Sequence, residues 1–343
     1  MFEQLTSQFN APEQRVPFDK DAGLAIIYNP TNPKAFEHAD SLRQYVGEIW
    51  PGKNGKPRVV YAESQPTVEA SMEFLAELEQ EGFTHYSIHG GDGTYSKVLL
   101  AAANLESEGI FVTSADGNAC DLPHAVHTVF FKNNPLDALR YGSIGKIRPI
   151  DINIETLDGE TSQFQAINYF GIGLSGVVAR RLNSPEYRQA VDGLSRAERL
   201  RLEAKLVWQE AGAMQPFHVL NDDGSEATTE RQIIEHSFLG IPHMAKMRFG
   251  SKNIVFSPKA IVGELASRQL SDLTRGLGGA ALGLTKIHSG EEDRLRVYAE
   301  DQDYMFAQVD GDLLLIPNGS IITIRKRRNP IVNLVHTKLI RKN

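Results

Sequence analysis

The segment that most constrains this chain is His89–Thr94, HGGDGT, which places three glycines around one aspartate. It follows the apolar run FTHYSI, which predicts a buried strand, and it precedes YSKVLLAAA, which predicts a helix. A loop that leaves a strand for a helix is where α/β proteins hold phosphates, because glycines let the backbone approach oxygen atoms and a helix N-terminus attracts anions. The segment therefore predicts an α/β sheet with a phosphate-binding loop at this position.

The residues of this loop suit different tasks. We expect Gly90, Gly91 and Gly93 to offer backbone N–H groups to an anion, and Thr94 to add a hydroxyl at the start of the helix. Asp92 would repel phosphates unless its carboxylate meets Mg²⁺, a ribose hydroxyl or a proton in transit. The alternative is a tight turn with a solvated aspartate, which is the commoner outcome for a bare Gly-x-Gly but not for Gly-Gly-Asp-Gly-Thr behind a strand.

The first part of the chain, residues 20–145, alternates between short β-rich runs and amphipathic helical patterns. One helical pattern carries Val68, Met72, Leu75 and Leu78 on one face and ends at Gly82. The β-rich runs cover residues 23–29, 58–62, 84–89 and 109–113. This alternation predicts an open, mostly parallel sheet covered by helices, as in an α/β nucleotide-binding domain.

The second part of the chain, residues 146–324, changes to β-rich runs with short connections. The runs are RPIDINIE, SQFQAINYF, NIVFSP, RLRVYA and SIITIRK. Their spacing predicts a mostly antiparallel second domain. A helical insert at 195–212 starts with a capping pattern, Ser195 and Glu198, and the polar segment 221–230 predicts a turn or an exposed loop.

The Gly-Gly-Asp-Gly-Thr motif resembles the signature shared by diacylglycerol kinases, sphingosine and ceramide kinases and, more distantly, NAD kinases. Other pieces of the chain are similar to this family in the same order, over most of residues 23–330. The matching positions are Asn29, Pro30 and Thr31 in the nucleotide loop, Ser64 after the second strand, Asn118 and Asp121 in the segment 115–122, Gly171 and Gly173 in the segment 167–182, and Asp310, Gly311 and Asp312 in the late Asp-Gly-Glu motif.

The chain departs from the family pattern in three places. Asn32 and Pro33 replace the usual Ser-Gly of the nucleotide loop, and two extra residues separate Asn118 from Asp121. The segment IVGELAS, residues 261–267, lacks the Asp-Gly pair with which relatives help to hold a structural Mg²⁺. These departures leave the lipid substrate unspecified.

The resemblance implies a two-domain lipid-kinase-like architecture, with a nucleotide-binding domain at 20–145 and a β-rich substrate-binding domain at 146–324. The C-terminal segment 325–343 would return to the first domain. ATP and Mg²⁺ would be the cofactors. The nucleotide-binding residues implied are Asn29, Pro30, Thr31, Ser64, Gly90, Gly91, Gly93, Thr94 and Asn118. Catalytic roles would fall to Asp92, Asp310 and Asp312, Mg²⁺ would be held by Asp92 and Asp310, and either Asp310 or Asp312 would be the general base.

The function expected from this resemblance is transfer of the γ-phosphate of ATP to a hydroxyl of a diacylglycerol- or sphingoid-type lipid. Two alternatives stay open. A soluble nucleotide kinase akin to NAD kinase would share the glycine loop but would turn over without lipid. A catalytically inactive relative, suggested by the altered loops, would bind ATP without transferring phosphate.

Composition sets the remaining expectations. A length of 343 residues suits two domains, and a single cysteine, Cys120, excludes an internal disulfide and favours a reducing cytoplasm. The first 21 residues have neither a basic start nor an apolar core, so export is not expected.

The net charge of the chain is −7, yet seven Lys and Arg residues and no acid follow from Arg325 onward. This basic tail predicts a peripheral contact with the inner membrane surface or a solubilising end. No nucleic-acid motif accompanies it, and a homodimer is compatible with the sequence.

Overall fold

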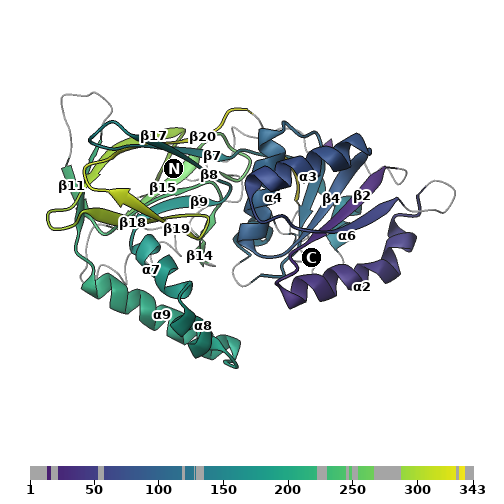
Figure 1. Cartoon of the computed structure of the whole chain (residues 1–343), viewed down its shortest axis with the longest axis horizontal. Coiled ribbons are helices and arrows are strands. Elements are labelled where there is room, and N and C mark those ends of the chain that lie inside the picture. Colours follow the sequence, from purple (N-terminus) through teal and green to yellow (C-terminus); the bar gives the residue numbers. More distant parts are fainter. Residues whose placement is uncertain are drawn as a thin grey trace, which may run out of the picture.

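The computed structural model comprises two domains that lie side by side (Figure 1). The structure describes residues 14–16, 22–52, 58–117, 120–126, 128, 135–221, 230–244, 247–248, 254–265, 287–329 and 332–336. The strands of the first domain are β1 (Gln14–Arg15), β2 (Gly23–Tyr28), β3 (Val59–Glu63), β4 (Phe83–His89), β5 (Ile110–Thr113), β6 (Ser143–Ile147) and β21 (Val332–His336).

These strands form one sheet in the order β1-β6-β21-β5-β4-β2-β3. The strands from β21 to β3 are parallel, and β6 and β1 extend the sheet with antiparallel pairs. The expected open, mostly parallel sheet is confirmed. Helices α2 (Pro33–Ile49) and α6 (Pro135–Tyr141) cover one face, α3 (Val68–Gln80) and α4 (Asp92–Asn104) cover the other, and the short α5 (Asp121–Ala125) follows β5.

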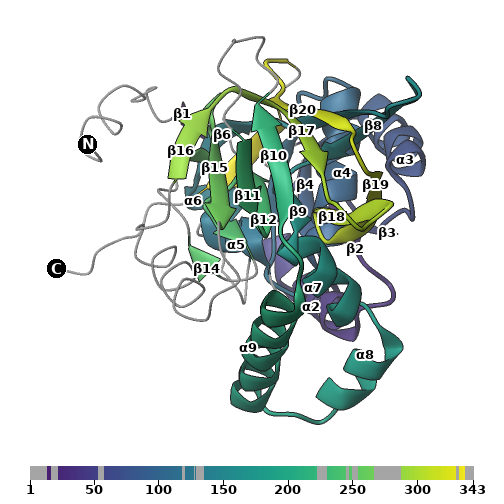
Figure 2. The ribbon, with the colours of Figure 1, turned by 90° about the vertical axis from the view of Figure 1, so that its left-hand side faces the viewer.

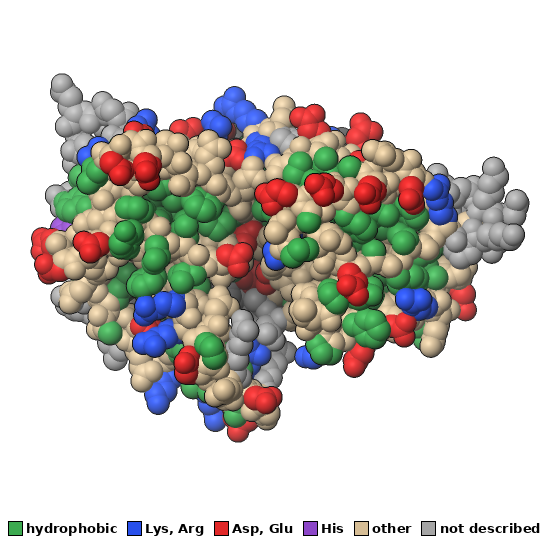
Figure 3. Space-filling model, in the orientation of Figure 1, with side chains coloured by type: hydrophobic (Ala, Val, Ile, Leu, Met, Phe, Trp, Pro, Cys, Tyr) green, Lys and Arg blue, Asp and Glu red, His purple; other side chains and the backbone are tan. Residues whose placement is uncertain are grey.

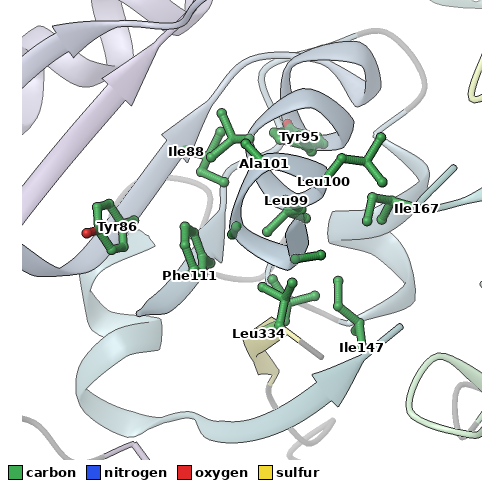
Figure 4. Packing of buried hydrophobic residues seen from close by; sticks show 14 of the residues in the cluster. Tyr86, Ile88, Tyr95, Leu99, Leu100, Ala101, Phe111, Ile147, Ile167 and Leu334 are labelled. Atoms are coloured by element: carbon green, nitrogen blue, oxygen red, sulfur yellow. The ribbon is translucent and has the colours of Figure 1, made fainter. Parts of the chain in front are cut away.

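The core on the α3–α4 face packs helix side chains against the sheet (Figure 4). Tyr95 and Leu99 of α4 are fully buried, and Phe111 and Leu334 from two parallel strands belong to the same cluster. Complete burial of such a side chain contributes about 2 kcal/mol. Ile167 of the second domain also joins this cluster, so apolar packing continues across the domain boundary.

Helix α3 forms where the sequence pattern predicts it. The hydroxyl of Thr67 at its N-cap accepts a hydrogen bond from the backbone N–H of Ala70, which satisfies one of the free donors of the first turn. Leu75 and Leu78 are buried on the inner face. The helix stops before Gly82, which has a φ of +83° that glycine adopts without strain.

The second domain contains two antiparallel sheets. Its strands are β7 (Ile150–Glu155), β8 (Thr161–Ala166), β9 (Tyr169–Gly173), β10 (Phe217–Asn221), β11 (Glu230–Ile233), β12 (Glu235–Leu239), β15 (Ala260–Leu265), β16 (Ile287–Gly290), β17 (Glu292–Tyr298), β18 (Tyr304–Val309), β19 (Asp312–Pro317) and β20 (Ile321–Lys326). The sheets run β11-β10-β17-β20-β7-β8 and β16-β15-β12-β9-β18-β19, with an apolar core between them. A small hairpin of β13 (His243–Met244) and β14 (Met247–Arg248) forms a separate two-stranded sheet.

Helices α7 (Leu174–Leu182), α8 (Pro185–Val191) and α9 (Arg196–Ala213) project from one end of the second domain (Figure 2). Helix α9 confirms the predicted helical insert. Ser195 and Glu198 make a reciprocal capping box at its start, as their spacing predicts. None of the described helices is long and apolar enough to cross a membrane.

Two of the expected strands were wrong in detail. The run SQFQAINYF divides into β8 and β9, which belong to different sheets, because the backbone N–H groups of Ile167, Asn168 and Tyr169 donate to the carboxylate of Asp310. These three N–H groups are then not available to a neighbouring strand, so the run cannot continue as one strand of a single sheet.

The run NIVFSP contains a turn over its described residues 254–258 rather than a strand. The Nζ of Lys326 donates to the carbonyl oxygens of Ile254 and Ser257, at 2.8 and 3.2 Å, and to that of Gly240 at 2.9 Å. Carbonyl groups that converge on one ammonium group cannot at the same time bond to a neighbouring strand. The prediction of a strand here rested on the apolar composition of the run and was wrong.

The chain crosses between the domains twice. It leaves the first sheet after β6, enters the second domain at β7, and returns after β20 to place β21 between β5 and β6. The second domain is therefore an insertion into the first sheet. The middle of the polar segment 221–230 lies outside the described residues, and the strands on either side of it, β10 and β11, pair antiparallel.

Candidate active site

The segment His89–Thr94, which we call the glycine loop, lies at the point where the chain order of the parallel strands reverses. From β2 the chain goes to the edge strand β3 and then crosses back to β4 on the other side of β2. Ligands of open α/β sheets bind at such a switch point, outside the carboxyl ends of the strands. Asn29 follows β2 there, and it bonds to the loop after β4 through its backbone N–H to His89 O at 2.9 Å and its Nδ2 to Thr94 Oγ1 at 3.3 Å.

Two glycines of this region are required by close packing. A Cβ on Gly90 would lie 2.6 Å from Thr94 Oγ1, and a Cβ on Gly117 would lie 2.5 Å from the Cα of Gly91. The loops after β4 and β5 therefore touch backbone to backbone. By contrast, a Cβ on Gly93 would meet nothing within 4 Å, so this glycine is not needed for packing.

Helix α4 begins inside the glycine loop. Gly91 is its N-cap and has no side chain that could occupy the first N–H groups of the helix, which suits an anion at this end. The hydroxyl of Tyr95 hydrogen-bonds with the carbonyl oxygens of Gly90 and Ser114, and so joins the loops after β4 and β5 from below. The loop geometry is thus fixed from within the protein.

The other nucleotide residues expected from the sequence lie along the same edge. Thr31 is exposed, and its N–H and hydroxyl both donate to Asn29 Oδ1 at 2.9 Å, while Pro30 is exposed beside it. Ser64 follows β3 and donates its backbone N–H to Tyr28 O at 2.7 Å. Asn118 lies outside the described residues.

Asp92 is the first residue of α4 and lies among other carboxylates. Its Oδ1 accepts the backbone N–H of Asp121 at 2.9 Å. Burial, together with the negative charges of Asp121 and Asp310, raises the pKa of Asp92 to about 7. We call Asp92, Asp121 and Asp310 the acidic cluster. Its members come from the loops after β4 and β5 and from the other domain, so the structure brings together two regions more than 200 residues apart.

Asp310 occupies the tight turn between β18 and β19. Asp310 and Gly311 have φ values of +51° and +94°, which is the pattern of a two-residue hairpin loop, and Val309 pairs with Asp312 across it. The sequence Asp-Gly-Asp therefore does form a turn, and the carboxylate of its first residue also reaches back toward the glycine loop.

The carboxylate of Asp310 accepts four hydrogen bonds. Oδ1 accepts the backbone N–H groups of Asn168 and Tyr169 at 2.8 and 2.9 Å, and Oδ2 accepts that of Ile167 at 2.7 Å. The hydroxyl of Ser96 in α4 also donates to Oδ2. A carboxylate has about four lone-pair positions, so this one has none to spare. Burial raises the pKa of Asp310, while these four hydrogen bonds act in the opposite direction.

Tyr169 lies beside the acidic cluster at the start of β9. It is almost fully buried, and burial raises the pKa of its hydroxyl well above the usual value, with further increases from Asp121, Asp92 and Asp310. The space-filling view looks onto the seam between the domains, where acidic side chains are visible in the hollow (Figure 3). Asp312, the third residue of the expected Asp-Gly-Asp motif, is exposed at the start of β19.

Some residues of the site were missed by sequence reasoning. Asp121 was matched to the family pattern without a role, and Tyr169 was not singled out, although the position of Asp121 after β5 and that of Tyr169 where the chain passes from β8 to β9 could have pointed to them. A second group, His38, His89 and Asp116, lies directly beneath the glycine loop. Its members come from three separate segments, so no spacing in the sequence indicates that they meet.

The basic tail is partly a structural element. Lys326 is buried, and Arg327 pairs with Asp151 at 2.6 Å and donates to Asn104 Oδ1 at 2.9 Å. Asn104 ends helix α4 and also bonds to Gln165 of the second domain at 3.0 Å. Helix α4 is therefore tied to the second domain near both of its ends. The segment 337–343 lies outside the described residues.

No protein-family model matches this chain, and no curated protein matches it. Among solved structures, it is similar to a diacylglycerol kinase from Bacillus anthracis str. Sterne, with a TM-score of 0.61 and 11% identity over 94% of this chain and 99% of that one. A second structure from the same organism, assigned to the same enzyme class, has a TM-score of 0.61 and 10% identity, and the match covers 94% of this chain and 100% of that one. Yeast NADH kinase complexed with NADH has a TM-score of 0.50 and 13% identity over 93% of this chain and 84% of that kinase. The two-domain architecture expected from the sequence is confirmed, and the chain has the fold of these kinases.

Proposed function

We propose that this protein is an ATP- and Mg²⁺-dependent kinase that transfers the γ-phosphate of ATP to a hydroxyl of a diacylglycerol- or sphingoid-type lipid. One observation carries the proposal. Asp310 of the other domain accepts a hydrogen bond from Ser96, which belongs to the helix that starts in the glycine loop. Its charge therefore lies near Asp92 of that loop and adds to burial and to the charge of Asp121 in raising the pKa of Asp92. Phosphoryl transfer requires positioned phosphates and neutralised charge, and a glycine loop beside clustered carboxylates supplies both requirements.

The acidic cluster fits a magnesium ion. Asp92 accepts backbone N–H groups from Asp121 and Leu122, which leaves about two of its lone-pair positions for a hard cation. Asp310 would contribute negative charge rather than a ligand oxygen, because its four positions are taken. When bound, Mg²⁺ would neutralise the phosphate oxygens during transfer. The backbone of Gly90–Thr94 would hold the phosphates.

Asp312 fits the role of general base better than Asp310. A base must accept a proton from the substrate hydroxyl, and only Asp312 has an exposed carboxylate in this turn. Asp310 is then a positioning residue that fixes the turn against α4 and the strand β9.

The second domain offers apolar surface for a lipid acceptor. Leu313 and Leu315 follow Asp312 on β19, and they are 43% and 50% exposed although leucine favours burial. A pocket of about 200 Å³ on the same domain is lined mostly by apolar side chains, among them Phe217, Met305 and Phe306. These features favour an acceptor with hydrocarbon chains over a water-soluble one.

The test is incubation of the purified protein with γ-labelled ATP, Mg²⁺ and a total lipid extract, followed by identification of any labelled product. Wild type and the exposed control Asp301→Asn should label a lipid, and Asp92→Asn should reduce the rate at least about 100-fold. Parallel incubations with NAD⁺ or NADH as the acceptor test a second candidate, which the fold shared with NADH kinase favours. Label in the dinucleotide alone would replace the lipid proposal with that candidate. ATP binding without transfer to any acceptor would mean an inactive relative.

A further inference from the structure

Three side chains that take no part in the proposed phosphoryl transfer converge beneath the glycine loop. They are His38 of α2, His89 at the end of β4 and Asp116 in the loop after β5. One donor atom from each lies within 4.8 Å of the others. The side chain of His38 is 11% exposed, and His89 is fully buried. We call these residues the His-His-Asp group.

The contacts within this group leave two ring nitrogens unsatisfied. Asp116 Oδ1 lies 2.8 Å from His38 Nδ1, and Asp116 Oδ2 lies 3.3 Å from His89 Nδ1. His89 Nε2 bonds with Ser87 Oγ at 2.9 Å. Within the described part of the chain, His38 Nε2 and His89 Nδ1 are buried without a hydrogen-bond partner. Most buried polar atoms are hydrogen-bonded, so two unsatisfied ring nitrogens in one small group need a physical explanation.

The arrangement of protons shows why His89 is poorly satisfied. A neutral imidazole carries a proton on one nitrogen only. If Nε2–H of His89 donates to Ser87, Nδ1 presents a bare lone pair to the carboxylate of Asp116 at 3.3 Å, and two acceptors face each other in a buried site. If the Ser87 hydroxyl donates to Nε2 instead, Nδ1–H faces Asp116 Oδ2 at 3.3 Å without forming a hydrogen bond. In both tautomers Nδ1 is buried and unsatisfied, and a cation between the imidazole and the carboxylate would satisfy it.

We propose that His38, His89 and Asp116 bind one divalent transition-metal ion, with Zn²⁺ as the best chemical match. Two imidazoles and one carboxylate form a donor set that Zn²⁺ accepts, with a fourth position left for water. Binding would replace the proton shared by His38 and Asp116, because ligands must present lone pairs to the metal. The proposal does not depend on the kinase activity, and the site is separate from the one proposed for Mg²⁺ at Asp92.

Outer contacts hold these ligands in position. Ser87 fixes the ring of His89, and the hydroxyl of Ser114 donates to Asp116 Oδ2. Such second contacts fix the tautomer and the orientation of metal ligands. The backbone carbonyl of Asp116 also accepts from Asn32 Nδ2 at 3.1 Å. An ion here would therefore tie α2, β4 and the loop after β5 together directly under the glycine loop.

The test is metal binding by the intact protein after removal of bound metal with a chelator. Titration with Zn²⁺, followed by calorimetry, should give one equivalent per chain for wild type and for His124→Gln, which alters an exposed histidine of α5. His38→Gln and His89→Gln should each lose affinity at least about 100-fold, and Ser87→Ala about 10-fold. Equal affinity in His38→Gln and wild type would overturn the proposal.

A measurement on wild type alone covers the case in which the variants fold poorly. Co²⁺ in place of Zn²⁺ should give the strong visible absorption of a four-coordinate site, and X-ray absorption of the Zn²⁺ form should show two imidazole ligands. No saturable binding at micromolar metal, or only the weak spectrum of six-coordinate Co²⁺, would mean a hydrogen-bonded group without a metal and would end the proposal.

Discussion

The hydroxyl of Ser96 donates to the carboxylate of Asp310, although the two residues lie 214 positions apart in the chain. Ser96 belongs to the helix that starts in the glycine loop, and Asp310 belongs to a turn of the inserted domain. Three backbone N–H groups from the crossing between β8 and β9 complete the contact. This contact fixes the two domains against each other at the candidate site.

Replacing Asp310 with Asn should destabilise the fold. Asparagine tolerates the φ of +51° at this position, but its NH₂ group would face N–H or O–H donors that now meet a carboxylate oxygen. We expect a loss of about 3 kcal/mol in the free energy of unfolding, measured by urea denaturation. The matched control Asp312→Asn changes the same turn at an exposed carboxylate and should stay within about 0.5 kcal/mol. Equal stability of both variants would show that the four hydrogen bonds to Asp310, of which the one from Ser96 joins the two domains, do not stabilise the fold.

Replacing Asp92 with Asn should stabilise the metal-free protein at neutral and higher pH. The folded-state pKa of Asp92, about 7, lies above the ordinary value of 3.8, so ionising this carboxylate costs folding free energy as pH rises from about 4 to 7. The variant should therefore match wild type near pH 4 and exceed its stability by on the order of 3 kcal/mol at pH 8.

Chemical denaturation of both proteins at several pH values, without divalent cations, measures this difference. Asp301→Asn, an exposed substitution, should follow wild type throughout. A difference between Asp92→Asn and wild type that does not change with pH would mean that burial and the neighbouring carboxylates do not raise the pKa of Asp92.

Gly117→Ala should disturb the glycine loop, whereas Gly93→Ala should not. The added Cβ at Gly117 would lie 2.5 Å from the backbone of Gly91, so one of the two loops must move. We expect a loss of about 1–3 kcal/mol in stability and a weaker affinity for ATP, measured by calorimetric titration. At Gly93 a Cβ meets no atom within 4 Å, and alanine inside the first turn of α4 should raise stability by up to about 1 kcal/mol. Similar effects of the two substitutions would contradict the packing described for these loops.

His236 should make the stability of the protein fall at alkaline pH. This buried histidine of β12 contacts Asp293 at 2.8 Å and Glu264 at 3.2 Å. Burial alone would lower its pKa, but the hydrogen bonds and charges of these carboxylates outweigh burial and raise the pKa from 6.5 to about 9. The protonated form therefore stabilises the fold fully below pH 6.5, and this contribution of about 3 kcal/mol is lost as pH rises through 9.

The check for His236 is the difference in unfolding free energy between wild type and His236→Gln across this pH range. The difference should shrink by about 3 kcal/mol between pH 6 and pH 10. A control variant, His218→Gln, alters a less buried histidine of β10 and should give no comparable change. A pH-independent difference for His236→Gln would rule out the proposed charge pairing.

Local patterns in the sequence predict the first sheet, α3 and α9, because their signals lie within one segment. Thr67 and Gly82 mark the ends of α3, and Ser195 and Glu198 mark the start of α9. The glycine loop is likewise predictable, since a strand, glycines and a helix follow one another directly. These elements depend on backbone propensity and apolar periodicity, which a single segment contains.

The features that the sequence does not predict depend on distant partners. The apolar run at 254–258 forms a turn because Lys326, 72 positions later than Ile254, binds its carbonyl groups. The predicted strand divides into β8 and β9 because the carboxylate of Asp310 accepts the N–H groups of residues 167–169. The His-His-Asp group likewise meets only when helix α2, the end of β4 and the loop after β5 come together. Each case requires knowledge of tertiary neighbours, which override the local preference of the segment.

The most direct test of the central claim is a crystal structure of the protein soaked with Mn²⁺ and a non-hydrolysable ATP analogue, with the metal located by anomalous scattering. The account predicts a triphosphate on the backbone of Gly90–Thr94 and a Mn²⁺ peak bonded to Asp92, with Asp310 nearby but not coordinated. A triphosphate bound away from this loop, or a metal bonded to Asp310 in place of Asp92, would contradict it.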